Sequence, residues 1–152
     1  MPNSLTRAQG HIVNNLFWAR MHGGATHFPI ALLVVSVAFD AGGFWWRESS
    51  RQRDFHAVGF YSLLIAAAAS PAAVLSGIVL SKGQFIGNGA LARHHLFIWP
   101  AFSLLVGLAA WRLLVREHPP RRAFGAYLLL AILTTAAMLG AGYWGGEMIL
   151  GT

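Results

Sequence analysis

Four apolar stretches recur along this chain, and they restrict its fold more than any other feature of the sequence. An α-helix rises 1.5 Å per residue, so about twenty residues cross the hydrocarbon core of a bilayer, which is about 30 Å thick. Charged residues make up 11% of the chain, against about 25% in typical soluble domains. The sequence therefore predicts membrane-spanning helices over residues 26–46, 56–81, 94–115 and 123–150.

The connections between these stretches are short, which predicts one all-α domain over residues 1–152, an integral membrane bundle of four helices in up-down-up-down order. Before the first stretch, apolar residues recur at helical spacing among polar ones, namely Val13, Leu16, Phe17 and Trp18. This spacing suggests a short helix lying in the membrane interface over residues 1–20, with an ordered tail as an equal alternative. Residues 1–20 lack the pattern of a signal peptide, so we expect a genuine first span.

Proline and glycine mark three positions within the spans. Pro29 suits the first turn of a helix, where its missing N–H leaves no hydrogen bond unmade, and this places His27 at the mouth of span one. Pro71 lies in the middle of span two and predicts a kink there. Gly142 and Gly146 form a GxxxG pair in span four, a pattern that lets two helix backbones pack closely.

The arginines and lysines are unevenly divided between the two ends of the predicted bundle. The face with the turns after spans one and three holds Arg47, Arg51, Arg53, Arg112, Arg116, Arg121 and Arg122. The opposite face holds Arg7, Arg20, Lys82 and Arg93. Because cytoplasmic loops carry the excess of positive charge, we expect a multi-pass inner-membrane protein with both termini in the periplasm.

Histidines gather at the predicted outer end. Alternating spans place five of the seven histidines there, together with one acid: His11, His22, His27, His94, His95 and Glu147. Imidazole is the commonest metal ligand and the usual axial ligand of b-type haem. The chain has no cysteine, which excludes iron–sulfur clusters, thiolate ligands and covalently attached c-type haem. A cofactor would therefore be held by histidine, carboxylate or thioether.

Haem b is the cofactor that this layer suggests, because a haem needs one or two histidines from different helices at matching depth. His27 at the head of span one and His95 at the head of span three meet this condition and are the predicted metal ligands. Neighbouring side chains on a helix point about 100° apart, so only one of His94 and His95 should face the interior. His22 stays open as a replacement for His27, because the turn at Gly23-Gly24 could bring either inward.

Charged residues near the histidines have roles in the same hypothesis. Arg20, Lys82 and Arg93 lie close enough in sequence to pair the haem propionates. Glu147 could hydrogen-bond the second nitrogen of a ligand histidine, or it could be an interfacial charge at the end of span four. The histidines have two alternatives to haem, namely another metal ion and a structural role as interfacial anchors.

One acid lies within a predicted span. Asp40 falls about two turns before the inner end of span one, and an intramembrane carboxylate is a functional hypothesis by default. Counting depth along the spans places Arg112, Tyr61 and Ser62 at a similar height. We expect a paired or neutralised Asp40 to tie the bundle together, with a role in proton relay as the alternative.

A motif at the start of span one carries a family resemblance: His22, then His27-Phe28-Pro29-Ile30-Ala31-Leu32, with Asp40 further along the same span. In these residues the chain resembles a widespread group of small bacterial four-helix membrane proteins, catalogued as a predicted membrane domain of unknown function. The similarity extends to His95 before Leu96-Phe97 and to the glycine-rich segment from Gly142 to Glu147, over about residues 20–150. Some relatives look fused to c-type cytochrome domains, so the resemblance implies a redox role at the outer face. This chain lacks such a domain, and a separate partner would have to supply or receive its electrons.

These observations lead to one expected function with two alternatives. The chain lacks the GxSxG, Walker and HExxH motifs, so neither hydrolysis nor phosphoryl transfer is indicated. We expect a b-haem electron-transfer subunit of a larger membrane complex, passing electrons between membrane quinol and a periplasmic redox partner. A non-redox accessory subunit and a small permease or metal-handling protein are the alternatives. The net charge of +6 belongs to a membrane protein and does not indicate a nucleic-acid partner.

Overall fold

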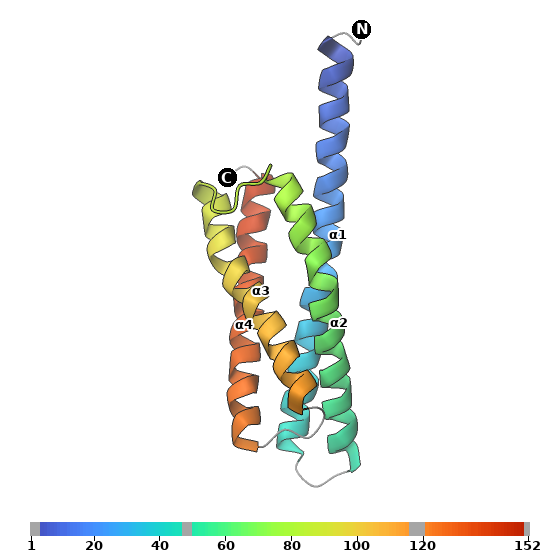
Figure 1. The fold of residues 1–152 in the computed structure, drawn as a ribbon, viewed down its shortest axis with the longest axis vertical. Helices are drawn as coiled ribbons and strands as arrows, with labels where there is room; N and C mark the ends of the chain where they lie inside the picture. Colours follow the sequence, from blue (N-terminus) through green and yellow to red (C-terminus); the bar gives the residue numbers. More distant parts are fainter. Residues whose placement is uncertain (1–3, 47–49, 116–120, 151–152) are drawn as a thin grey trace.

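Four α-helices make up the computed structural model, which describes residues 4–46, 50–115 and 121–150. They are α1 (Ser4–Trp45), α2 (Ser50–Leu80), α3 (Gly89–Val115) and α4 (Arg121–Leu150). Each helix contains a segment long and apolar enough to cross a membrane, and the described residues include no strand. The prediction of an all-α membrane bundle of four helices is confirmed (Figure 1).

The helices alternate in direction, so the molecule has two distinct ends (Figure 1). At the upper end of Figure 1, the loop of residues 81–88 joins α2 to α3. The lower end carries the other two connections, from α1 to α2 and from α3 to α4. The upper end corresponds to the predicted outer face and the lower end to the predicted inner face. Arg47, Arg116 and His118, which the prediction placed on the inner face, lie outside the described residues.

α1 differs most from its predicted range. It runs without interruption from Ser4 through Pro29, and its N-terminal part rises above the other helices (Figure 1). Residues 4–20 therefore continue the first helix instead of forming a separate interfacial one, and Pro29 lies inside α1 instead of in its first turn. A proline inside a helix removes one backbone bond, here to the carbonyl of Ala25, and membrane helices tolerate this loss. The other three helices begin two to six residues before their predicted starts.

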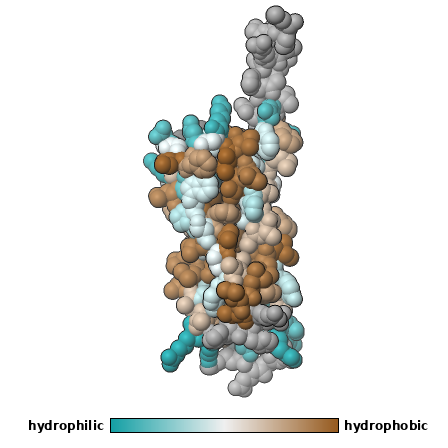
Figure 2. All heavy atoms as spheres, in the orientation of Figure 1, coloured by the Kyte–Doolittle hydropathy of each residue, from teal (hydrophilic) through white to brown (hydrophobic). Residues whose placement is uncertain are grey.

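The four helices form two hairpins. α1 packs along α2 and α3 packs along α4, whereas contacts between the two hairpins are far fewer. The apolar core between them includes the fully buried Leu33, Leu63, Leu105 and Ala131. Many large apolar side chains, such as Leu96 and Leu114, point outward, as expected for helices that contact lipid. Figure 2 shows brown side chains over the middle of the molecule and teal ones at both ends.

The predicted GxxxG pair does not bring two helices of this chain together. A Cβ built on Gly142 or Gly146 would meet no atom within 4 Å. The tight approach occurs at Gly59 of α2 instead, where a Cβ would collide with the carboxylate of Asp40. The closest packing of backbone against side chain therefore surrounds a buried charge.

Candidate functional site

A cavity of about 70 Å³ lies among the helices near the upper end. Its walls are mainly apolar and come from all four helices, including Ile30, Val74, Ile98, Phe102 and Met138. Three histidines line the same cavity: His22 from α1, and His94 and His95 from α3. Apolar walls with a few polar groups are the usual form of a ligand site, which makes this cavity the first candidate.

His22 reaches the cavity from the middle of α1. Its Nδ1 donates to the backbone carbonyl of Ala73 on α2 (3.0 Å) and lies 3.1 Å from the hydroxyl oxygen of Ser76. The ring rests against Gly77, where a Cβ would come within 2.9 Å of the Cε1 of His22. The absence of a side chain at Gly77 therefore leaves the space that the His22 ring occupies against α2.

His94 faces His22 from the other hairpin. Its Nδ1 donates to the backbone carbonyl of Ala141 on α4 (2.8 Å), and its ring lies close to Gly145. The ring centres of His22 and His94 are 6.5 Å apart, with an interplanar angle of 72°. The two imidazoles are thus fixed to different hairpins and meet across the space between them.

His95 holds the loop of residues 81–88 onto α3. It is buried, and its Nδ1 donates to the carbonyl of Ile86 (3.0 Å). Trp99, whose ring centre lies 5.7 Å from that of His95, donates its Nε1 to the carbonyl of Phe85 (2.9 Å). Both side chains therefore fix this loop beside the cavity, which Gln84 also lines.

The structure separates His27 from this group. His27 is exposed, its Nδ1 hydrogen-bonds the carbonyl of Gly23, and it does not line the cavity. The structure does not bring the predicted pair His27 and His95 together, whereas His22, the open replacement, faces His94. Positions 22 and 27 lie on one continuous helix with side chains pointing about 140° apart, so the two rings cannot face the same way. The expected choice between His94 and His95 also does not arise, because both line the cavity.

Hydrogen bonding sets the tautomer of the three cavity histidines. A carbonyl oxygen only accepts, so Nδ1 of each ring carries a proton, and Nε2 keeps its lone pair in the neutral ring. Nε2 is a usual metal-binding atom of imidazole, and metal-bound histidines commonly donate their other N–H to a carbonyl or a carboxylate. Nε2 is therefore the nitrogen of each ring that could bind a metal ion or accept a hydrogen bond.

The spacing of His22 and His94 fits one metal atom between the rings. Two imidazoles on opposite sides of a metal have ring centres about 6 Å apart, given a metal–nitrogen distance of about 2 Å, and the observed separation is 6.5 Å. No group of three or more His, Asp or Glu among the described residues is placed to hold a metal ion. A porphyrin needs more room than the present cavity of about 70 Å³. Haem binding would therefore require α2 and α3, which contact each other at few points, to move apart.

The charged residues predicted to bind the cofactor lie outside the cavity wall. Arg20, Lys82 and Arg93 are exposed, and Glu147 is half-buried near the upper end of α4. The guanidinium of Arg93 lies 4.5 Å from the ring centre of Trp144, a cation–π contact that fixes it over α4. These side chains therefore belong to the surface of the upper end.

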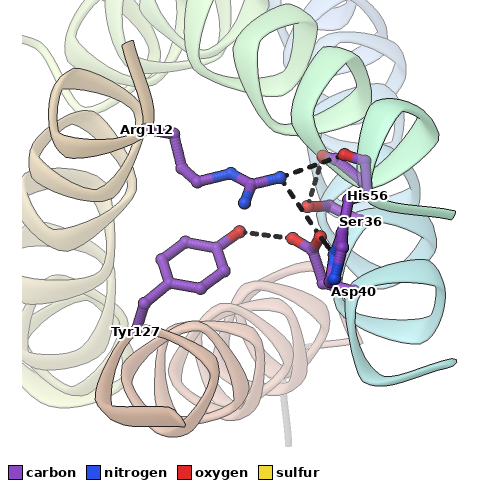
Figure 3. A network of polar contacts seen from close by, with 6 residues as sticks. Ser36, Asp40, His56, Arg112 and Tyr127 are labelled. Atoms are coloured by element: carbon purple, nitrogen blue, oxygen red, sulfur yellow. Dashed lines mark hydrogen bonds and ion pairs between the residues drawn. The ribbon is translucent and has the colours of Figure 1, made fainter. Parts of the chain in front are cut away.

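A second polar cluster lies at the lower end and joins all four helices (Figure 3). Asp40 of α1 is fully buried, and its Oδ1 accepts hydrogen bonds from Arg112 Nη2 of α3 (3.1 Å) and His56 Nδ1 of α2 (3.2 Å). Tyr127 of α4 donates its hydroxyl to the other carboxylate oxygen (2.8 Å). Beside them, the hydroxyl of Ser36 donates to the carbonyl of Gly59 (2.8 Å). The pairing of Asp40 with Arg112 agrees with the depth count from the sequence.

Arg112 is enclosed on every side. Its side chain is fully buried, and Nη2 also donates to the backbone carbonyl of His56 (3.1 Å). Three aromatic rings lie around the cation with centres 5.2–5.5 Å away: Phe60, Phe124 and Tyr127. Nε and Nη1 are buried and have no hydrogen-bond partner among the described residues. Asp40 thus supplies the opposite charge, and the rings face the rest of the cation.

Sequence reasoning found only part of this lower cluster. Tyr61, one of the residues placed at the height of Asp40, is exposed, and the donors from α2 and α4 are His56 and Tyr127. Asp40 lies five residues before the end of α1, and His56 and Tyr127 each lie six residues after the start of their helix. Depth counted from the lower ends of the helices would therefore have placed both donors at the level of Asp40, but it does not give the direction of their side chains.

Comparison with known proteins identifies the family to which the chain belongs. No curated protein and no solved structure matches the chain significantly. The sequence profile of a family described as "Predicted membrane protein (DUF2231)" matches residues 20–151, which is most of the chain and includes the residues of both polar clusters. The chain therefore belongs to the predicted membrane protein family DUF2231.

Proposed function

We propose that the chain is an electron-transfer subunit of the bacterial inner membrane that binds haem b at the upper cavity, where His22 and His94 would hold the iron. The observation that carries this proposal is the 6.5 Å separation of the two rings, each fixed through Nδ1 to a carbonyl of a neighbouring helix. The haem would supply the one-electron chemistry, and the chain supplies ligation, orientation and an apolar surrounding.

Different residues of the chain would orient the ligand rings and shape the cavity. The carbonyls of Ala73 and Ala141 orient the two ligand rings, since each accepts the Nδ1–H and leaves Nε2 for the iron. Gly77 leaves the space that the ring of His22 occupies. His95 fixes the loop beside the cavity through the carbonyl of Ile86.

The upper end is the proposed place of electron exchange. Exposed Arg20, Lys82 and Arg93 give it positive charge, which suits haem propionates or an acidic redox protein. We place this end in the periplasm, because the sequence puts more arginine at the lower end. Membrane quinol is the proposed donor. A periplasmic cytochrome or another subunit of a membrane complex is the proposed acceptor.

A non-redox accessory subunit is the second candidate, and the glycines of α4 favour it. Gly142 and Gly146 form a small-residue pair with open space around them, so this face of α4 leaves room for a helix of another chain. In that case the histidine cavity would serve only to hold the two hairpins together. The two candidates differ in whether the purified protein carries haem.

A spectrum of the purified protein tests the haem proposal. The protein is made in haem-replete cells, purified in mild detergent and measured as a reduced-minus-oxidised spectrum together with a pyridine haemochrome assay. We expect b-type bands that are lost in His22→Ala and in His94→Ala. His27→Ala is the matched control, because this ring is exposed and outside the cavity, and it should keep the bands.

Two outcomes would contradict the proposal. A colourless protein that is folded would exclude haem and leave the accessory role. Bands that persist in His22→Ala but vanish in His27→Ala would restore the ligand pair first predicted from the sequence.

A further inference from the structure

The lower cluster is a separate centre from the haem site proposed above. Asp40 and His22 lie eighteen residues apart on α1, which is about 27 Å along a helix. No step of the proposed electron transfer uses Asp40, Arg112, His56 or Tyr127. Ionisable side chains buried inside a membrane bundle often have a function, and we therefore consider this cluster separately.

His56 is the most exposed of the three side chains that bond to Asp40. Its side chain is 12% exposed, whereas the side chains of Asp40 and Arg112 are 0% exposed. Because Nδ1 donates to Asp40, Nε2 is the atom of this ring that can accept a further proton. The ring packs against Gly43, which leaves no room for a Cβ there, and against the edge of Phe124.

The charges around His56 are balanced before any proton is added. The titratable or charged groups of the described cluster are Asp40 from α1, Arg112 from α3 and Tyr127 from α4. The carboxylate and the guanidinium cancel, and the tyrosine is neutral. A proton on Nε2 of His56 therefore raises the net charge of the cluster from zero to +1.

We propose that His56 is a proton-binding site that takes up one proton at Nε2 from the aqueous phase at the lower end. The inference is independent of the haem proposal. The resulting imidazolium and the guanidinium of Arg112 then share one oxygen, Oδ1 of Asp40, which each reaches in a single contact (3.2 and 3.1 Å). Two cations on one oxygen repel each other, and the bond between Arg112 and Asp40 weakens.

Weakening this bond loosens one hairpin from the other. Asp40 and His56 belong to the α1–α2 hairpin, whereas Arg112 belongs to the α3–α4 hairpin. Two other hydrogen bonds also cross between the hairpins and remain, from Arg112 Nη2 to the carbonyl of His56 and from Tyr127 to the second oxygen of Asp40. Nε and Nη1 of Arg112 add none, because they are buried without a hydrogen-bond partner among the described residues. Contacts between the hairpins are sparse, so protonation should widen their separation at the lower end.

Distance measurement between the hairpins tests the proposal. The chain has no cysteine, so Arg51→Cys on α2 and Leu114→Cys on α3, both exposed positions near the lower end, can each carry a spin label. Electron–electron double resonance is recorded on the full chain in lipid nanodiscs at about pH 8 and about pH 5. We expect the distance to lengthen at the lower pH, by less than a full separation of the hairpins, because the bonds from Arg112 to the His56 carbonyl and from Tyr127 to Asp40 remain.

The controls separate His56 from other histidines. In the same labelled background, His56→Gln should keep the pH 8 distance at both pH values, and His56→Asn provides a second neutral variant if the first does not fold. His27→Gln, which removes an exposed histidine near the middle of α1, should leave the pH response unchanged. No change of distance in the chain with His56 present would overturn the proposal, and so would a change that persists in His56→Gln or His56→Asn.

Discussion

At the scale of single residues, the lower cluster shows how a carboxylate is kept inside a membrane bundle. Asp40 accepts three hydrogen bonds, one each from His56, Arg112 and Tyr127, and Arg112 brings the compensating charge. Removing one member of a buried ion pair leaves the other uncompensated, which destabilises far more than removing both. The two charges therefore depend on each other.

A double-mutant cycle measures this dependence. Arg112→Leu should destabilise the protein by about 3–5 kcal/mol, the range for breaking a buried pair, because it leaves the Asp40 carboxylate without its cation. The double variant Asp40→Leu with Arg112→Leu should lose less than Arg112→Leu alone. The free energy of unfolding in detergent micelles is the measurement. A double variant that loses the sum of the two single losses would show that the pair is not coupled.

Substitution of Gly59 tests how closely α2 packs against the side chain of Asp40. A Cβ on Gly59 would collide with the Asp40 carboxylate, so Gly59→Ala should destabilise by about 1–3 kcal/mol, as overpacking does. Gly107→Ala is the matched control, because a Cβ there would meet no atom within 4 Å. Thermal unfolding of both variants is compared with that of the parent protein. Equal midpoints for the two variants would contradict the collision.

The sequence allowed some of these residues to be predicted and not others, for a physical reason. Depth along a helix is countable, and the count placed Arg112 at the level of Asp40. Rotation about the helix axis is not countable without a fixed starting point, so His22 and His27 could not be told apart until α1 proved continuous through Pro29. The same uncertainty hid His56 and Tyr127, whose side chains had to point inward to reach Asp40.

At the scale of elements, the pairing of α1 with α2 positions the upper site as well as the lower one. The ring of His22 rests on Gly77 of α2 and donates to the carbonyl of Ala73 on the same helix. The apolar runs made all four helices predictable, because length and hydropathy alone decide whether a helix spans. Which helix pairs tightly with which was not predictable, since it depends on small residues at contacts such as Gly77.

Substitution of Gly77 should displace His22 without touching a proposed ligand. A Cβ on Gly77 would lie 2.9 Å from Cε1 of the ring, so Gly77→Ala should lower haem affinity by roughly tenfold to a hundredfold, as loss of a ligand-orienting contact does. Gly142→Ala is the control, since its Cβ would meet open space. Haem content and band intensity in both variants are the measurement. Unchanged haem binding in Gly77→Ala would show that this contact does not set the position of His22.

At the scale of the whole molecule, two hairpins meet at few points and are joined by a polar contact near each end. His22 and His94 meet near the upper end, and Asp40 and Arg112 meet at the lower end. Between them lies an apolar core, and outside them lies an apolar surface (Figure 2). The apolar core and the polar side chains near both ends therefore span the same pair of hairpins.

The distribution of charge predicts an orientation of this bundle in the membrane, which can be measured in a chain that has no cysteine. Single substitutions Asn88→Cys in the upper loop and Arg122→Cys at the start of α4 each expose one thiol, since both positions are exposed at opposite ends. The excess of arginine at the lower end predicts that this end is cytoplasmic. In intact cells, a membrane-impermeant maleimide should therefore label Asn88→Cys, and it should label Arg122→Cys only after the membrane is permeabilised. The opposite pattern would place the histidine cavity on the cytoplasmic side, and quinol would then have to pass its electrons to a cytoplasmic partner.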